Sequence, residues 1–321
     1  MTGAPRQALG CLLLAFATAC GTTAIADDDP QVWLDRMANA TQTLDYEGTV
    51  IRIAEDRAEA LKVVHSVSDG VIRERVVAQE GNGLEIIRNG NEVHCILPES
   101  KSVLVEEWND QSTLFSTLPA GRIRTGNQYD IVIMREDRVA GREALMLAIK
   151  PHDEYRYEHR VWLDVETGFP LQTQLIGDDD SWLELVKFAD ISLGSDVLSS
   201  ALAPSYSTED FRWLSSPRRE STPVDVSGLH GEDLPPGFRV TSAQEEALLG
   251  SDEPVTHIMY SDGLATVSVF ISTHSGDAVT ERSNAGASNT YSVVVDDHRV
   301  TAVGDVPAAT VKRIADSIVI E

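Results

Sequence analysis

A regular alternation of apolar and polar residues runs through the middle of the chain, from Tyr155 to Ile176. Its period of two is that of a strand with one buried side, and it persists as far as Asp164. A turn follows, because Gly168 can adopt positive φ and Pro170 cannot donate to a ladder. We therefore predict a β-hairpin in a sheet that is apolar on one face and polar on the other. The predicted faces carry Tyr155, Tyr157, His159, Val161 and Leu163 on one side, and Arg156, Glu158, Arg160, Trp162 and Asp164 on the other.

Helical spacing precedes this hairpin, and strand-like spacing surrounds it. Asp29-Pro30 is a capped helix start, and apolar residues follow at helical spacing up to Leu44. From Tyr46 onward, short alternating runs separated by Gly and Asn turns predict an antiparallel meander, which must pack against another element or close into a barrel. Residues Trp108–Asn127 interrupt the meander, and we predict a short helix or lid there. The predicted strands are Tyr46–Ile53, Ala60–Ser68, Val71–Val77, Leu84–Arg88, Glu92–Leu97, Ser102–Glu106, Tyr129–Met134, Arg142–Lys150 and Trp182–Leu193.

The remainder of the chain predicts a connection and a second domain. Ala201–Val224 mixes Pro, Ser, Thr and Arg, and its aromatic residues are expected to dock on a domain face. Beyond it come a hairpin at Ser261-Asp262-Gly263, a predicted mobile loop at Thr273–Asn289, and a last helix after Asp305. We divide the chain into a signal peptide (1–26), a first domain (27–210), a linker (211–225) and a second domain (226–321).

The first 26 residues have the pattern of a secretory signal peptide rather than of folded structure. Arg6 gives a positive start, Leu9–Ala19 is apolar but too short to span a bilayer, and Ala24-Ile25-Ala26 is a cleavage signal. The alternative is lipidation at Cys20, within a loose lipobox. No later stretch reaches the roughly 20 apolar residues of a membrane span. We expect cleavage after Ala26 and a periplasmic, not membrane-spanning, protein.

The charge of the chain limits its partners. The formal net charge is −25 over 321 residues, which argues against binding of a nucleic-acid backbone. It also gives no support to adhesion at an anionic membrane surface. The local positive excess lies in the predicted linker, at Arg212, Arg218 and Arg219.

The sequence contains no local motif for catalysis, metal binding or a cofactor. It lacks a nucleophile elbow, a zinc-protease helix, a C-x-x-C pair and a phosphate-binding loop, and its eight His residues are dispersed. Distant residues can still assemble a catalytic site, so a hydrolase stays open as a minor alternative. Binding is the favoured class, since a bent sheet over one helix can hold an apolar ligand. Candidate pocket linings, each first of all a core candidate, are Trp33, Trp108, Phe115, Tyr157 and Trp162.

Several motifs resemble known families. The hairpin core W-L-D-x-E-T-G-x-P, within Tyr155–Ile176, resembles the matching hairpin of LolA/LppX-type lipoprotein carriers. Leu234–Phe238, Met259–Phe270 and Val300–Ile320 resemble, in this order, the RseB/MucB family. This resemblance implies an α+β fold. It consists of a large N-terminal, LolA-like, half-open antiparallel β-barrel wrapped over a helix and a smaller mixed α/β C-terminal domain.

The same resemblance implies a function. Members of the family are periplasmic regulators that bind the periplasmic part of an RseA/MucA-type anti-sigma factor and protect it from site-1 proteolysis. Lipopolysaccharide or mislocalised lipoprotein is the implied releasing signal. A lipid or lipoprotein carrier of LolA type is the alternative, and a homo-oligomer is left open. Expected partner contacts are Phe211, Trp213, Tyr260, Asp262, Gly263 and Leu264. The alternative is that Tyr260 and Leu264 simply flank a turn, with Gly263 there for its backbone freedom.

Overall fold

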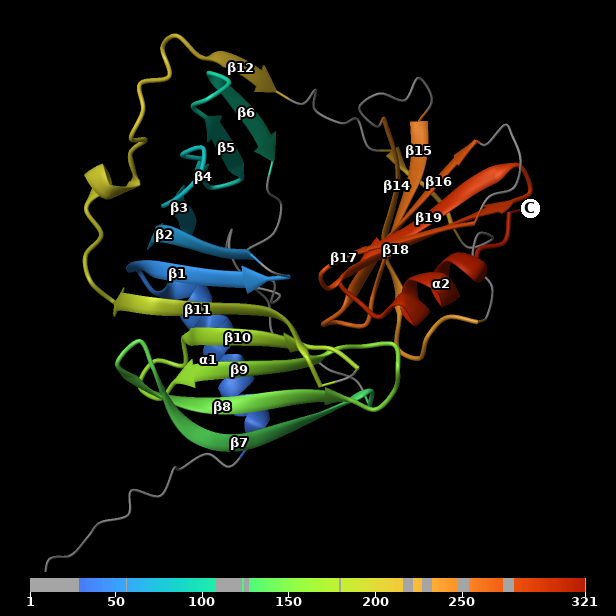
Figure 1. Cartoon of the computed structure of the whole chain (residues 1–321), viewed down its shortest axis with the longest axis horizontal. Helices are drawn as coiled ribbons and strands as arrows, with labels where there is room; N and C mark the ends of the chain where they lie inside the picture. Colours follow the sequence, from blue (N-terminus) through green and yellow to red (C-terminus); the bar gives the residue numbers. More distant parts are fainter. Residues whose placement is uncertain are drawn as a thin grey trace, which may run out of the picture.

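The computed structural model of the chain describes residues 29–55, 57–107, 123, 127–178, 180–215, 222–226, 233–247, 254–273 and 280–320. Within these residues it contains two separate sheets and two α-helices (Figure 1). The predicted signal peptide, Trp108, Phe115, Arg218, Arg219 and nearly all of the predicted lid lie outside them. We call the two assemblies the N-terminal sheet and the C-terminal sheet.

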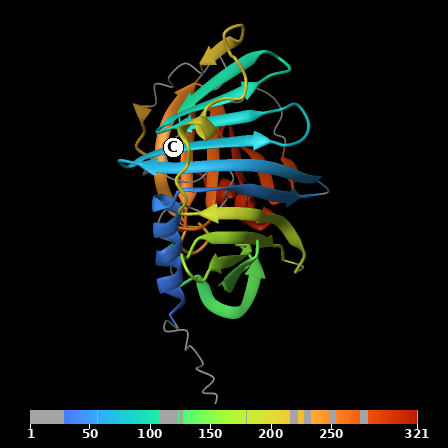
Figure 2. The same cartoon turned by 90° about the vertical axis from the view of Figure 1, so that its left-hand side faces the viewer.

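Helix α1 (Pro30–Thr43) begins where the sequence predicts it. The Asp29 carboxylate accepts a hydrogen bond from the backbone N–H of Gln31 at 2.9 Å, which caps the helix. The helix crosses the strands of the N-terminal sheet at a steep angle (Figures 1 and 2). Its apolar stripe is buried against that sheet, through Trp33, Leu34, Met37, Ala38 and Ala40.

The N-terminal sheet is a long, open and strongly curled sheet. Its strand order is β12-β6-β5-β4-β3-β2-β1-β11-β10-β9-β8-β7, so its two end strands do not pair. Strand β7 also approaches β11, although three strands separate them in this order, which shows the curl. The expected half-open barrel is therefore present only as a curled open sheet. The strands are β1 (Tyr46–Ala54), β2 (Arg57–Ser68), β3 (Val71–Ala78), β4 (Glu85–Asn89), β5 (Glu92–Leu97), β6 (Ser102–Glu107), β7 (Tyr129–Val139), β8 (Arg142–Pro151), β9 (Glu158–Asp164), β10 (Pro170–Ile176), β11 (Trp182–Leu193) and β12 (Arg212–Ser215).

The central hairpin consists of β9 and β10, and its turn follows the sequence motif. Gly168 has φ +79°, and the Asp164 carboxylate accepts hydrogen bonds of 2.8 Å from the backbone N–H and the hydroxyl of Thr167. The expectation of one polar face is wrong at the end of β9, because Val161 and Trp162 point to opposite faces and both are buried. Side chains of β7 and β8 cover the second face there.

The C-terminal sheet has the order β13-β14-β15-β16-β19-β18-β17, with helix α2 (Ala308–Asp316) packed on β18 and β19. The predicted apolar stripe of this last helix is confirmed, since Val311, Ile314 and Ala315 are buried in the sheet's core. The prediction of a loop over Thr273–Asn289 is wrong in part. Polar and small residues there form an exposed edge strand, which the alternation of apolar residues does not reveal. The strands are β13 (Thr222–Pro223), β14 (Arg239–Ala247), β15 (Pro254–Ser261), β16 (Thr266–Thr273), β17 (Glu281–Ala285), β18 (Ser288–Val295) and β19 (His298–Gly304).

The predicted linker contributes one strand to each sheet. Strand β12 pairs in parallel with β6, at the edge of the N-terminal sheet, and β13 pairs antiparallel with β14. A short 3₁₀ helix, Ser199–Leu202, precedes it. Backbone pairing therefore ties both ends of the connection to the sheets that they join.

Candidate functional site at the junction of the two sheets

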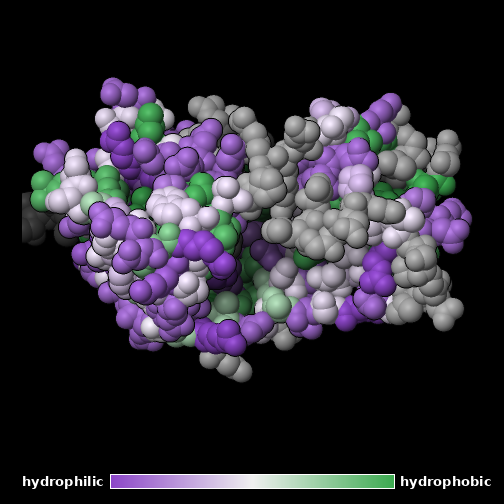
Figure 3. Space-filling model, turned by 90° about the horizontal axis from the view of Figure 1, so that it is seen from above, coloured by the Kyte–Doolittle hydropathy of each residue, from purple (hydrophilic) through white to green (hydrophobic). Residues whose placement is uncertain are grey.

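The two sheets meet where the loop between β8 and β9 contacts the turn between β15 and β16. The loop covers residues 152–157, and the turn covers residues 262–265. Both follow directly from strands whose apolar residues fix their place in a core, so the loop and the turn are held firmly at their ends. Seen from above, the surface is hollowed between the two halves (Figure 3).

Arg156 is the centre of this contact, and its side chain is completely buried. Its Nε donates to Asp262 at 2.5 Å and its Nη1 to Asp153 at 2.5 Å, while Nη2 donates to the backbone carbonyl of Pro236. The guanidinium carbon also lies 5.0 Å from the centroid of the Phe238 ring. Three acceptors and an aromatic face thus surround one buried charge, which is the condition under which such a charge is tolerated.

Asp262 is the matching group on the C-terminal side. Its Oδ2 accepts from Arg156 and, at 2.9 Å, from the hydroxyl of Tyr129. Its Oδ1 accepts from the backbone N–H groups of Leu264 and Ala265 at 2.9 and 2.8 Å. One carboxylate therefore shapes its own turn and joins it to the other sheet.

The electrostatics of the junction follow from burial and pairing. Burial acts against the charged form of Arg156, but hydrogen bonds to Asp262 and Asp153 outweigh it and raise its pKa. Burial, followed by the charge of Asp262, raises the pKa of Tyr129 far above its usual value. Both groups keep one protonation state throughout the physiological range, so this contact is constant there.

A second group of contacts joins the same loop to helix α2. The backbone carbonyl of Tyr155 accepts from the Thr310 hydroxyl at 2.7 Å, and its hydroxyl accepts from Arg313 at 2.5 Å. The hydroxyl of Tyr157 accepts from the Asn289 side chain at 3.1 Å. The start of the central hairpin is therefore the element on which the C-terminal sheet docks.

The residues around this turn lie inside the protein rather than on a free surface. Tyr260 is 0% exposed in the core of the C-terminal sheet, and Asp262 is 5% exposed. Leu264 is 7% exposed and packs into a cluster of the N-terminal half with Trp33 and Tyr129. Gly263, with φ +103°, is half-buried in the same turn. The other half of the chain covers this turn here, and its role as a partner contact stays a prediction.

The expected partner contacts in the linker have a different environment. Trp213 is 51% exposed on β12, with its ring 5.2 Å from that of His94 in an edge-to-face arrangement. Arg212 is exposed beside it, and Phe211 is half-buried. The sequence predicts that Trp213 docks on a domain face, whereas half of its surface is open to solvent.

The described pocket candidates are packed side chains. Trp33 and Trp162 are 2% and 3% exposed, each within a core cluster, and the indole N–H of Trp162 donates to Asp137 at 3.0 Å. Tyr157 is 8% exposed at the junction, where burial, with a smaller contribution from Asp178, raises its pKa to about 12. The hypothesis that Trp162 faces a cavity thus loses its support.

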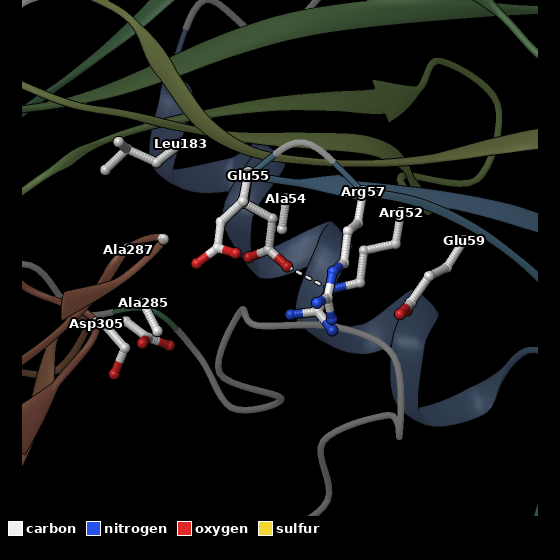
Figure 4. A pocket seen from close by; sticks show the side chains of 12 residues that line it. Arg52, Ala54, Glu55, Arg57, Glu59, Leu183, Ala285, Ala287 and Asp305 are labelled. Carbon is white, nitrogen blue, oxygen red and sulfur yellow. Dashed lines mark hydrogen bonds and ion pairs between the residues drawn. The ribbon is translucent and has the colours of Figure 1, made fainter.

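An open cleft of about 260 Å³ lies beside the junction (Figure 4). Arg52, Arg57 and Glu59 border it from strands β1 and β2, and Asp305 faces them from the C-terminal half (Figure 4). The lining also contains Ala54, Glu55, Leu183, Glu184, Ala285, Gly286, Ala287 and Ser288. Four carboxylates thus face two guanidinium groups, which leaves the cleft acidic.

Arg52 is paired within its own side of this cleft. It donates to Glu184 at 2.6 Å. Burial opposes its charge, but the hydrogen bond to Glu184 and the charges of Glu59 and Asp305 raise its pKa. An extended, positively charged segment would meet an excess of acceptors and a complementary charge here.

Sequence reasoning missed most of this site. The alternation places Arg156 on a polar face, and nothing in one strand's pattern shows that a distant turn will bury it. The sequence feature closest to Arg156 is the pair of aromatic residues on either side of it, Tyr155 and Tyr157, which is typical of a contact surface. The residues of the cleft lie at strand ends, where charged side chains are ordinary.

The described residues hold no group of three or more His, Cys, Asp or Glu side chains that could bind a metal ion. No helix within this part of the chain is long and apolar enough to cross a membrane. The fold and the junction define a protein of two domains, built around a curled open sheet.

The chain belongs to the MucB/RseB family. The family model of the MucB/RseB N-terminal domain matches residues 29–206, and that of the C-terminal domain matches residues 225–319. The resemblance found from the sequence motifs is thereby confirmed.

Comparisons with individual proteins agree. The sigma factor AlgU regulatory protein MucB of Pseudomonas aeruginosa is 30% identical over 313 residues, which cover 96% of each chain. The solved complex of MucA and MucB from P. aeruginosa matches with a TM-score of 0.72 and 28% identity, over 91% of this chain and 99% of the other. A crystal structure of MucB matches with a TM-score of 0.59 and 26% identity, over 92% and 99%.

Proposed function

We propose that the chain is a periplasmic negative regulator of an extracytoplasmic-function sigma factor. It binds the periplasmic region of an anti-sigma factor of RseA/MucA type and protects that region from site-1 proteolysis. A lipid or a mislocalised lipoprotein releases it. The AlgU regulatory role of the P. aeruginosa relative and the solved MucA/MucB complex support this proposal.

One observation carries the proposal: the chain is more similar to MucB in complex with MucA than to MucB alone. The TM-scores are 0.72 for the complex and 0.59 for MucB alone, at nearly equal coverage and identity. Coverage is nearly the same in the two matches, and we infer that the difference reflects how the parts are arranged. We propose that the arrangement joined by Arg156 and Asp262 is close to a partner-bound one.

Two surfaces are our candidates for the partner contact. The acidic cleft between Arg52 and Asp305 suits a positively charged, extended segment. Strand β12 adds the exposed ring of Trp213 at the edge of the N-terminal sheet. Exposed aromatic residues at a free strand edge are frequent anchors for peptides.

Release by a lipid-like ligand requires a difference in affinity between two states. The ligand dissociates the partner only if it binds the free regulator better than the complexed one. Coupling of about 1–3 kcal/mol would change the affinity for the partner by roughly 5- to 150-fold. We propose that this coupling is transmitted by movement of the two domains about the connection at Ala201–Val224.

The test is a titration of the chain with the periplasmic segment of a MucA-type anti-sigma factor, followed by digestion of that segment with a site-1 protease. We expect a complex and slower cleavage, and faster cleavage again once lipopolysaccharide is added. Asp305→Lys should weaken the complex, whereas Glu80→Lys, which changes the net charge equally in an exposed turn, should not. No complex with the wild-type chain would refute the proposal, and equal effects of the two variants would remove the cleft from it.

A further inference from the structure

A second cleft lies within the C-terminal domain, between the β17–β18 hairpin and helix α2. Its volume is about 340 Å³, at the small end of the range for small-molecule sites. Tyr291 lies in its lining, and Val311 and the first residues of α2 add apolar surface. The lining residues all belong to the C-terminal domain, although one of them, Asn289, also donates to Tyr157 at the junction. The inference does not depend on the proposed function.

The charge of this cleft is opposite to that of the chain. Arg282 and Lys312 line it, and no carboxylate is among the described residues that do so. The whole chain carries a net charge of −25, and the cleft at the domain junction is acidic. Two cations without a carboxylate among the described lining residues therefore attract anions locally.

The two cations share one aromatic ring. The guanidinium carbon of Arg282 lies 5.4 Å from the centroid of the Tyr291 ring, and the Nζ of Lys312 lies 5.6 Å from it. Tyr291 is 5% exposed and fixed in the core, so it holds both cations at a defined place through cation–π contacts. Like charges on one ring repel each other, and an anion between them would relieve that repulsion.

The donors of the two cations are incompletely used. Arg282 has no hydrogen bond or ion pair through its side chain with any residue that the structure describes, which leaves its planar donors available. Lys312 donates to Asp316 on the same helix, and this hydrogen bond raises its pKa while the charge of Arg282 acts against it. An ammonium group offers three donors, so Lys312 keeps others for a ligand.

A neutral donor adds to the lining. Asn284 borders the cleft on the same face of β17 as Arg282, and its side chain forms no hydrogen bond within the described part of the chain. Ser283 and Thr290, paired directly across the hairpin, also border the cleft, but their side chains point to the opposite face of the sheet. Guanidinium, ammonium and amide donors together match an anion with several oxygens and two charges.

We infer that this cleft binds a phosphomonoester group through Arg282 and Lys312, with the body of the ligand against the apolar side of the cleft. The dianionic phosphate matches the two cations, and its three terminal oxygens match the surrounding donors. The same chemistry occurs in soluble sugar phosphates and in the head group of an anionic lipid, and the test separates these two sources.

The test titrates the full chain with two probes, glucose 1-phosphate and phosphatidylcholine vesicles that contain phosphatidic acid, and vesicles of phosphatidylcholine alone serve as the blank. Arg282→Gln and Lys312→Gln should each weaken binding by about fivefold or more, since each removes a charge-assisted hydrogen bond. The matched control is Arg299→Gln, a cation of the same sheet that pairs with Glu281 outside the cleft. It should bind like the wild type.

Each result either supports or overturns the inferred phosphate site. Binding of glucose 1-phosphate that depends on Arg282 identifies a soluble ligand class, and binding of the acidic vesicles alone identifies a lipid head group. Absence of binding to both probes overturns the inference. So does an equal loss in Arg299→Gln, because binding would then follow net charge rather than the cleft. Arg282 and Lys312 are exposed, so thermal unfolding of the variants should match that of the wild type.

Discussion

The guanidinium of Arg156 and the carboxylate of Asp262 form a buried ion pair, with Nε and Oδ2 2.5 Å apart, that joins the two domains. Arg156 lies in the loop before β9, and Asp262 lies in the turn after β15. Their side chains are 0% and 1% exposed. A movement of one domain against the other that breaks this contact must separate the two charges. The pair therefore adds to the free-energy cost of such a rearrangement.

Removal of one member of this pair should destabilise the protein strongly. Arg156→Met leaves the Asp262 carboxylate buried without its cation, which costs about 3–5 kcal/mol in comparable cases. Urea unfolding should show this loss in the free energy of unfolding. Arg160→Met is the matched control, because Arg160 pairs with Glu158 at 31% exposure and should cost about 1 kcal/mol or less.

The same pair can be tested for coupling. In a double-mutant cycle, Arg156→Met combined with Asp262→Asn should cost clearly less than the sum of the single changes, since the second change removes the stranded charge. Strict additivity would show that the two groups contribute independently and would contradict the assignment of a joining ion pair.

The hairpin motif makes a second prediction, about Gly168. An added Cβ would lie 2.8 Å from the Cβ of Arg36 on α1, in a residue with φ +79°. Gly141 has nearly the same φ, +76°, but nothing lies within 4 Å of its added Cβ. Gly141→Ala should therefore cost only the left-handed strain, about 1–2 kcal/mol. Gly168→Ala should lower the free energy of unfolding by more than this, as measured by thermal or urea unfolding. Equal losses in the two variants would show that α1 shifts to accommodate the added methyl group.

Acid should destabilise the protein through His159. Burial lowers the pKa of His159 to about 4, and the charge of Asp262 opposes this shift only in part. The unfolded chain has a His pKa of about 6.5, so it binds more protons than the folded chain between these values. Stability is therefore complete above about pH 6.5 and falls as the pH drops toward 4, by at most about 3 kcal/mol.

The readout for this prediction is the slope of stability against pH. His159→Gln should flatten the slope between about pH 6.5 and 4, whatever its effect at neutral pH. His298→Gln, at the first residue of β19, provides a His→Gln comparison on the other sheet. An unaltered slope in His159→Gln would assign the acid sensitivity to other groups.

Local patterns predicted the elements of this fold well, and the assembly of those elements poorly. The cap at Asp29, the turn at Gly168 and the buried stripe of α2 depend on near neighbours in sequence, and all three are confirmed. Asp262 and Leu264 have the same sequence character as a surface turn, and only docking of the other domain buries them. One chain's alternation contains no information about which distant surface will cover a turn.

The edge strands show a related limit. Strand β17 contains Arg282 but no apolar residue larger than Ala, so its alternation is invisible and its sequence is typical of a loop. Its residues form a strand because their backbone pairs antiparallel with β18. The phosphate site inferred above was therefore out of reach of the sequence, because one of its two cations lies on this strand.

Trp213 supplies the last prediction, which concerns the partner rather than stability. Its ring is 51% exposed on the end strand of the N-terminal sheet, and Trp182 on β11 is 49% exposed. Loss of either exposed ring should change the free energy of unfolding by about 0.5 kcal/mol or less. Trp213→Ala should nevertheless weaken binding of the anti-sigma segment about fivefold or more, because aromatic side chains dominate such contacts. Calorimetric titration of Trp213→Ala and Trp182→Ala side by side separates the two surfaces, and unchanged affinity in Trp213→Ala would exclude β12 as an anchor without bearing on the complex itself.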